Sequence, residues 1–157
     1  MEVISMTYEE LLCVADKEGL IVKEKALESG DGRIYNNRVA IRKDLPTTAE
    51  KTCVLAEELG HYYTTSGDIL NQTSIQNRKQ ELQARVWAYS HMITMDMLLE
   101  CKRRGCRSRY EVAEYLGVTE EFLQDALDQY RSIYGIAHQS EKYLVTFEPF
   151  NIYDMDD

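Results

Sequence analysis

Apolar residues recur at helical spacing near the start of the chain. The members of this pattern fall on one face of an α-helix: Tyr8, Leu11, Leu12 and Ala15. Thr7-x-x-Glu10 matches a capping box, in which the threonine side chain accepts a hydrogen bond from a backbone N–H at the helix start. Gly19 is suited to end the helix. We therefore expect a helix over residues 7–17 that packs through its apolar face.

The pattern then changes to short apolar runs separated by turn residues. Leu20-Ile21-Val22 is a strand candidate, and Gly30-Asp31-Gly32 marks a turn. Two further runs, residues 33–35 and 39–41, flank Asn36-Asn37, and asparagine tolerates the positive φ of a tight hairpin. This segment predicts a small antiparallel sheet.

Helical spacing returns in the middle of the chain. Pro46 and Thr47-x-x-Glu50 begin a helix that runs to about Thr64, before Ser66-Gly67-Asp68 interrupts it. Residues 74–104 then predict either one long helix or two helices with a kink. The apolar stripe of this segment has four members: Leu82, Val86, Tyr89 and Ile93.

Residues 109–134 have the apolar pattern of a helix-turn-helix. The second helix carries four acidic residues against Arg131 alone, and they are Glu120, Glu121, Asp125 and Asp128. Such a helix would bring negative charge against phosphates, so we expect the unit at 108–135 to pack or to dock a protein rather than DNA. We predict a single domain over residues 1–137 that includes this unit. Residues 138–157 are expected to form a strand-like acidic tail that is only partly ordered.

Composition narrows the class of protein. The chain has 157 residues, 27 acidic against 18 basic ones, and a net charge of −9. Such a balance argues against a general binder of nucleic acid or of membrane surfaces, which needs a basic face. The four cysteines show no Cys-x-x-Cys spacing, and the N-terminal residues have neither the basic nor the apolar region of a signal peptide. We therefore expect a cytoplasmic protein with reduced thiols.

One helical segment carries residues suited to chemistry. On the predicted helix, Glu57 and His61 are i and i+4 and project side by side, while Glu58 is rotated by about 100° to one edge. In His-Glu-x-x-His, two histidines with this spacing hold a metal ion and the glutamate between them handles the proton of a water. In this chain a carboxylate replaces the first histidine. Taken alone, Glu-Glu-x-x-His also fits a solvated charge run on an acidic helix.

The following helix supplies a partner for this segment. Glu81 is followed by small residues, Ala84 and Ala88, on a face expected to be packed. Small side chains let two helices approach closely, so that Glu81 could reach His61. Gly60 costs about 1 kcal/mol in a helix interior relative to alanine, which indicates that another element packs very close there.

Taken together, the two segments resemble the ImmA/IrrE family of metallopeptidases, in the short form found in phages and mobile elements. The matching residues are Leu55-Ala56-Glu57-Glu58-Leu59-Gly60-His61, Gly67-Asp68-Ile69, Lys79-Gln80-Glu81, Ala84, Trp87 and Ala88. In that family the second helix reads Glu-x-x-Ala-Asn-x-Phe-Ala, and its glutamate is the third metal ligand. Most relatives have histidine at the position of Glu57. The resemblance covers most of residues 5–135.

The resemblance implies a fold and a site. The fold would be α+β and zincin-like, mainly helical, with a small antiparallel sheet beside the active-site helix. The site would hold one divalent metal ion through Glu57, His61 and Glu81, with Glu58 as the general base. Zinc is the expected ion, and manganese and iron are the alternatives because oxygen ligands favour harder ions.

The resemblance also implies a protein substrate. This would be a phage or mobile-element repressor with a helix-turn-helix, and its cleavage would relieve repression. One alternative is a catalytically inactive relative that regulates a repressor by binding it. Another is a structural partner protein whose carboxylates are surface charges. Neither nucleic acid nor a membrane is an expected partner.

Three further polar residues are left out of the predicted site. His91 lies ten residues beyond Glu81, about 80° round the helix and about 15 Å along it. His138 lies in a polar stretch after Gly135 and is expected on the surface. Asp68 is expected to cap the next segment rather than to bind metal, because aspartate after glycine commonly satisfies backbone donors.

Overall fold

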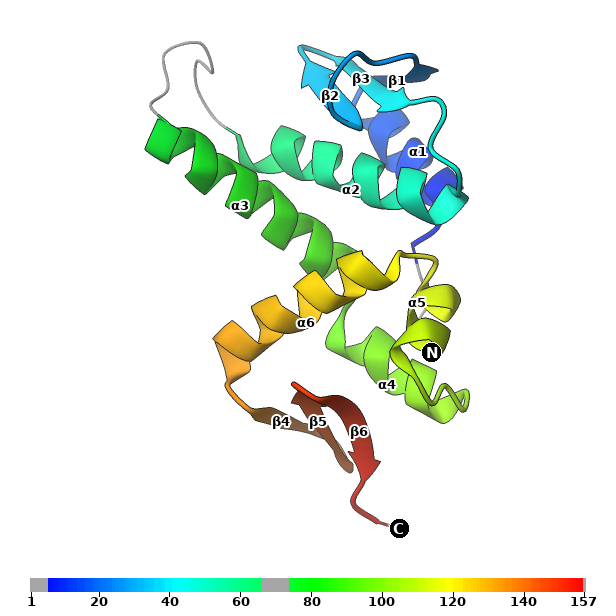
Figure 1. The fold of residues 1–157 in the computed structure, drawn as a ribbon, viewed down its shortest axis with the longest axis vertical. Helices are drawn as coiled ribbons and strands as arrows, with labels where there is room; N and C mark the ends of the chain where they lie inside the picture. The colour runs from blue at the N-terminus through cyan, green and yellow to red at the C-terminus, as the bar shows by residue number, and fades with distance from the viewer. Residues whose placement is uncertain (1–5, 66–73, 157) are drawn as a thin grey trace.

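The computed structural model describes residues 6–65 and 74–156, which form an α+β fold with a sheet near each end of the chain (Figure 1). The helices are α1 Tyr8–Lys17, α2 Thr48–Thr64, α3 Ser74–Met92, α4 Met95–Arg103, α5 Arg109–Leu116 and α6 Glu120–Tyr134. The strands are β1 Ile21–Lys25, β2 Gly32–Tyr35, β3 Arg38–Arg42, β4 Ala137–Ser140, β5 Tyr143–Phe147 and β6 Phe150–Asp154. The predicted α+β class and mainly helical character are confirmed.

The N-terminal sheet has the strand order β1-β3-β2. The predicted hairpin is present, because β2 and β3 pair antiparallel and Asn36 has a φ of 53° at the turn. β1 pairs with β3 in parallel, so the sheet is mixed rather than antiparallel throughout. The physical reason is that β1 joins the other edge of β3, and residues 26–31 lead the chain back towards β2. The inner face of this sheet rests on α2.

α2 and α3 form the closest helix pair of the molecule. The predicted cap is confirmed, because Thr47 Oγ1 accepts a hydrogen bond from the Glu50 backbone N–H at 3.1 Å. A Cβ added at Gly60 would lie 2.2 Å from the backbone oxygen of Ala84. The two helix backbones therefore meet at Gly60, as the helical glycine indicated.

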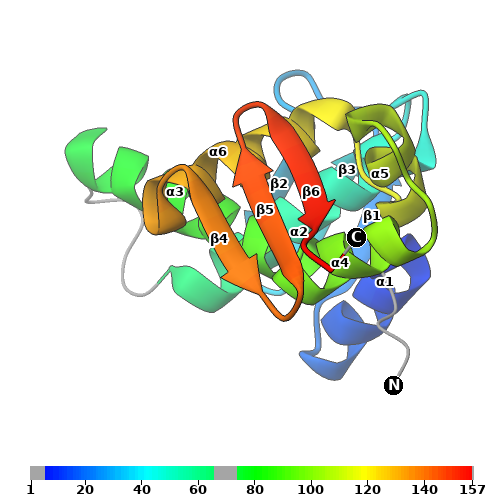
Figure 2. The same ribbon diagram turned by 90° about the horizontal axis from the view of Figure 1, so that it is seen from below.

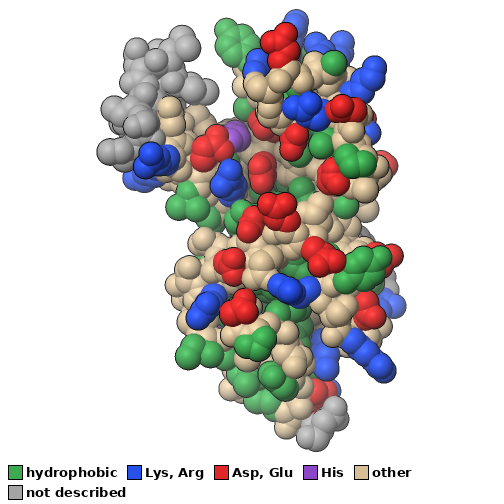
Figure 3. Space-filling model, viewed as in Figure 1, with side chains coloured by type: hydrophobic (Ala, Val, Ile, Leu, Met, Phe, Trp, Pro, Cys, Tyr) green, Lys and Arg blue, Asp and Glu red, His purple; other side chains and the backbone are tan. Residues whose placement is uncertain are grey.

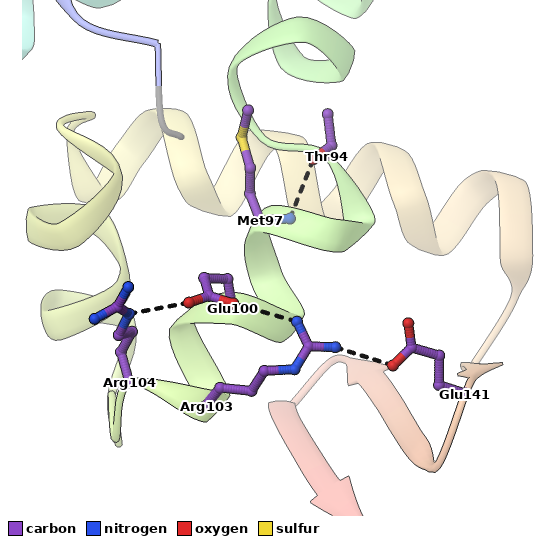
Figure 4. Close-up of polar contacts among 6 residues, drawn as sticks. All are labelled: Thr94, Met97, Glu100, Arg103, Arg104 and Glu141. Carbon is purple, nitrogen blue, oxygen red and sulfur yellow. Dashed lines mark hydrogen bonds and ion pairs between the residues drawn. The ribbon is translucent and has the colours of Figure 1, made fainter. Parts of the chain in front are cut away.

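The segment predicted as one or two helices is two. α3 ends at Met92, and the Thr94 side chain caps α4 by accepting a hydrogen bond from the Met97 N–H at 3.1 Å (Figure 4). The predicted apolar stripe is partly wrong, since Leu82 is 56% exposed. The N-terminal part of α3 extends beyond the other helices (Figure 1), and Ala84 is the first fully buried residue among the side chains of α3 that the structure describes.

α5 and α6 form the predicted helix-turn-helix-like pair. Ser108 caps α5, and Gly117, with a φ of 70°, ends it before Thr119 caps α6. The buried face of α6 contacts α3 and consists of four residues: Phe122, Leu123, Ala126 and Leu127. The acidic residues of α6 lie outside this face.

The C-terminal segment, expected as a partly ordered tail, forms an antiparallel sheet in the order β4-β5-β6 (Figure 2). Its alternation buries four side chains in the same hydrophobic core as α6: Tyr143, Val145, Phe147 and Ile152. Arg103 of α4 donates hydrogen bonds to Glu100 at 3.3 Å and to Glu141 in the β4–β5 turn at 2.9 Å (Figure 4). Apolar burial, together with this link, orders the segment.

None of the helices in the described parts of the chain combines the length and the apolar character that crossing a membrane requires.

We predict that Gly60→Ala destabilises the protein by about 3 kcal/mol, although alanine is the better helix former. The new methyl group would meet backbone atoms of Ala84, which cannot rotate away. Urea unfolding of the variant measures the loss, and Gln83→Ala, on the exposed side of α3, is the control with a change below about 0.5 kcal/mol. A gain in stability from Gly60→Ala would show that the two helices separate readily.

Candidate metal centre

The residues of the predicted site lie where α2 and α3 face each other. His61 Nε2 is 3.2 Å from Glu81 Oε1, although 20 residues separate them in the chain. The His61 side chain is 19% exposed and that of Glu81 is 55% exposed, so the pair lies at the border between core and solvent. The close approach at Gly60 brings the next residue of α2 within reach of α3. The structure therefore confirms that Glu81 reaches His61.

The spacing of this pair fits two chemical arrangements. A protonated imidazole and a carboxylate form an ion pair at such a distance. Two ligands that each lie about 2.1 Å from one tetrahedral ion are also about 3.4 Å apart. The 3.2 Å between His61 and Glu81 therefore accommodates neighbouring ligands of a single divalent ion without a large movement.

Glu58 lies on α2 beneath the N-terminal sheet. A Cβ added at Gly32, the first residue of β2, would lie 2.8 Å from Glu58 Oε1, so the strand covers the carboxyl group. Among the described residues, Glu58 is the one charged residue that is buried. Burial raises its pKa to about 7, and the negative charges of Glu57 and Glu81 add to the shift. A carboxyl group in this environment can both accept and donate a proton near neutral pH.

Glu57 is half-buried on the same helix. Burial raises its pKa, and the charges of Glu81 and Asp125 act in the same direction. Arg85 of α3 opposes the shift and is the cation that stabilises the Glu57 carboxylate. Across residues 6–65 and 74–156 no three His, Cys, Asp or Glu side chains are grouped closely enough to hold a metal ion. The assignment of Glu57, together with His61 and Glu81, as a ligand remains a prediction.

Acidic side chains gather across the middle of the face shown in Figure 3, between the N-terminal sheet and α6. The pKa of Asp125 is raised by burial and by its acidic neighbours on α6, and Arg85 opposes this shift as well. Three elements, α2, α3 and α6, therefore contribute charge to one region. Sequence reasoning missed Arg85, although its place four residues after Glu81 puts both on one face of α3.

Aromatic rings close one side of the α2–α3 pair. Tyr63 stacks on Trp87 with ring centroids 5.0 Å apart, and Trp87 stacks on His91 at 4.0 Å. The hydroxyl groups of Tyr62 and Tyr63 donate hydrogen bonds of 3.0 Å to Glu18 at the end of α1. Trp87 is half-buried in this stack. These contacts fix the C-terminal end of α2, which follows His61.

The other candidate residues lie apart from the pair. His91 is exposed, and its Nδ1 is 2.8 Å from the Trp87 carbonyl oxygen, which agrees with its omission from the site. His138 was expected on the surface but is half-buried, because it packs on Tyr134 with ring centroids 4.2 Å apart. Asp68 lies outside the described residues.

Comparison with known families gives one match. A peptidase family model described as the IrrE N-terminal-like domain matches residues 16–128 of the chain. The match spans the N-terminal sheet, both helices of the candidate centre and most of α6. No curated protein and no solved structure matches the chain.

We predict that Glu58→Gln stabilises the metal-free protein at alkaline pH. The folded pKa of about 7 exceeds the ordinary value of 4.5, so the folded state binds more protons between these values. The contribution of Glu58 to stability is therefore lost as pH rises from 4.5 through 7. A neutral amide avoids this loss, which reaches about 3 kcal/mol above pH 7.

Chemical unfolding with a chelator present, in mildly acidic and in alkaline buffer, measures the difference between the parent protein and Glu58→Gln. Glu114→Gln, at an exposed position of α5, is the matched control and should change little at either pH. A Glu58→Gln effect of equal size in both buffers would contradict the assignment of a buried charge.

Proposed function

The chain belongs to the peptidase family of IrrE N-terminal-like domains, and from this premise we propose that it is a metal-dependent endopeptidase. The observation that carries the proposal is the 3.2 Å contact between His61 and Glu81. Glu58, which follows the proposed ligand Glu57 on α2, is buried near this pair. A purely structural pair would not require a buried carboxyl group beside it, which costs stability.

The residues at the site are chemically suited to a divalent ion. His61 and Glu81 would hold it, with Glu57 as the third ligand, and imidazole nitrogen and carboxylate oxygen are both ligands of divalent zinc. When bound, the ion supplies a Lewis acid that polarises a peptide carbonyl and acidifies water. Zinc is the expected ion, while the two carboxylates bring manganese and iron closer in preference than two histidines would.

Glu58 would move the protons of the reaction. Its carboxylate takes a proton from the attacking water and donates it to the nitrogen of the leaving amine as the C–N bond breaks. The contact between Gly32 and Glu58 places the start of β2 beside this group. A peptide paired with the free edge of β2 would therefore present its backbone next to Glu58.

We further propose that the substrate is a helix-turn-helix repressor of a phage or mobile element, and that the protein acts in the cytoplasm to relieve repression. The support is the resemblance to the ImmA/IrrE family. The acidic second helix of the α5–α6 unit argues against DNA as the primary partner, since four carboxylates would face the phosphates.

A second function has a specific observation in its favour. Arg85 already places a positive charge next to Glu57, where most relatives have a histidine. A protein in which the positive charge of Arg85 took the place of a metal ion at Glu57 would bind the repressor without cleaving it. The two functions differ in whether Glu57 ligates metal.

We predict that Glu58→Gln lowers the rate of repressor cleavage by a factor of about 100 or more while the metal content is unchanged, because a base is lost and no ligand is. Gel analysis of the purified repressor and elemental analysis of the variant provide the two readouts, with Glu114→Gln as control. Loss of metal with cleavage intact would mean that Glu57 and Glu58 have exchanged roles. Absence of cleavage by the parent protein with bound metal favours the second function.

We predict that Glu57→His raises zinc affinity and leaves a working peptidase, whereas Glu57→Ala lowers metal affinity about tenfold. Calorimetric titration of both variants with zinc tests this, and titration with manganese should show a smaller gain for Glu57→His. If Glu57→Ala binds zinc as tightly as the parent protein, Glu57 is not a ligand.

A further inference from the structure

The outer face of the N-terminal sheet carries a cluster of cations in an acidic protein. Strand alternation and the register place one set of side chains on the face opposite α2, and four of them form what we call the basic sheet face: Lys23, Lys25, Arg33 and Arg38. They line a shallow groove whose floor is the small side chain of Ala40. In a chain of net charge −9, this is a local reversal of sign. Figure 3 shows Lys and Arg side chains gathered at the top of the molecule, over this sheet.

These four cations differ from their neighbours in having no ion-pair partner within the parts of the chain that the structure describes. On the same sheet Arg42 is bound to Asp31 at 3.1 Å. Lys51 of α2 is bound to Glu24 at 2.5 Å on the inner side. Like charges near one another on one face are unfavourable, and here Lys23 and Arg33 flank Ala40 in one cross-strand row. The sheet thus bears uncompensated positive charge where it faces solvent.

Apolar groups accompany the charge. Tyr35 is 71% exposed and Ile21 is 47% exposed, and both lie in the cross-strand row of Arg38. Charged side chains on the edge strands of a sheet protect it against aggregation. That purpose does not account for Arg38 on the central strand or for an exposed tyrosine beside it. Arginine and tyrosine are both enriched at protein interfaces, and this face exposes Arg33, Arg38 and Tyr35 together.

The size of the basic sheet face indicates which kind of partner it can bind. Strands of five residues span about 16 Å, and three of them span about 10 Å. Duplex binding at useful affinity takes roughly six to ten phosphate contacts, and a long polyanion would also meet the acidic surface around this patch. A short acidic peptide segment matches four cations without that conflict. We propose that the basic sheet face docks an acidic segment of the protein substrate, outside the catalytic centre.

This inference rests on the proposed function, because it assigns a substrate feature to the same protein. The link between the two sites is β2, where Gly32 contacts Glu58 and the next residue, Arg33, points to the opposite side, into the groove. A substrate held at β2 can therefore reach the catalytic carboxyl group and the basic sheet face at once. The acidic segment would set affinity for the substrate and leave the chemical step unchanged.

The test measures binding apart from cleavage. The full chain in the presence of a chelator is titrated against a fluorescent peptide of alternating Glu and Thr, against its Lys and Thr counterpart, and against a short single-stranded oligonucleotide. We expect the acidic peptide alone to bind, more weakly at high salt. The double variant Lys23→Glu with Arg38→Glu should weaken binding about tenfold, and Lys23→Gln with Arg38→Gln about threefold.

The matched control is Lys102→Glu with Arg131→Glu, which reverses two exposed cations in the C-terminal half and should change binding less than about twofold. Circular dichroism confirms that all variants fold. Unchanged peptide binding by the double reversal overturns the proposal. So does preferential binding of the oligonucleotide, or self-association of the parent chain that the double reversal abolishes and the peptide does not inhibit.

An activity measurement separates this inference from the proposed function. On the repressor, the double reversal should raise KM about tenfold, whereas kcat/KM for a short uncharged peptide should stay as in the parent protein. If the parent protein cleaves nothing, the proposed function fails while the peptide titration still tests the docking surface. An equal loss on both substrates contradicts a docking role.

Discussion

Contact between two backbones at Gly60 and Ala84 fixes the geometry on which the rest of the site depends. No side chain separates α2 from α3 at this point, since even a Cβ would come within 2.2 Å of a backbone oxygen. The contact brings His61 of α2 and Glu81 of α3 to 3.2 Å from each other, although they lie on different helices. Fully buried leucines at positions 55 and 59 hold α2 against the core on either side of Glu57 and Glu58. The apolar packing thus positions charged groups that would otherwise repel one another.

Electrostatic strain is concentrated in this region. Burial raises the pKa of Glu57 and of Glu58, and the negative charge of Glu81 adds to both shifts. Arg85 opposes the shift at Glu57 and at Asp125. A fold selected for stability alone would place an amide or an apolar residue at position 58. Carboxyl groups whose pKa is raised by burial and by neighbouring acids are characteristic of functional sites. Arg85 serves as the local counter-charge at position 57.

Local signals in the sequence predicted the elements well, and contacts between elements less well. The caps at Thr7 and Thr47, the turn at Asn36 and the meaning of Gly60 follow from short-range geometry, so the residues themselves reveal them. The parallel pairing of β1 and the exposure of Leu82 depend on which element lies next to which, and periodicity does not encode that. Glu81 could be paired with His61 because small residues mark the helix contact. The role of Arg85 and the position of Gly32 over Glu58 were missed, because both depend on the elements that these residues face.

The C-terminal sheet shows that the folded domain extends beyond the region matched by the family model. The family match ends at residue 128, inside α6, whereas Tyr143, Val145 and Phe147 complete the hydrophobic core against that helix. The region shared with the family and the region that builds the hydrophobic core therefore end at different residues of the chain. The C-terminal sheet, which lies beyond the shared region, covers one side of the hydrophobic core. Lineages that exchange this segment would alter one outer surface, while the His61–Glu81 pair between α2 and α3 kept its geometry.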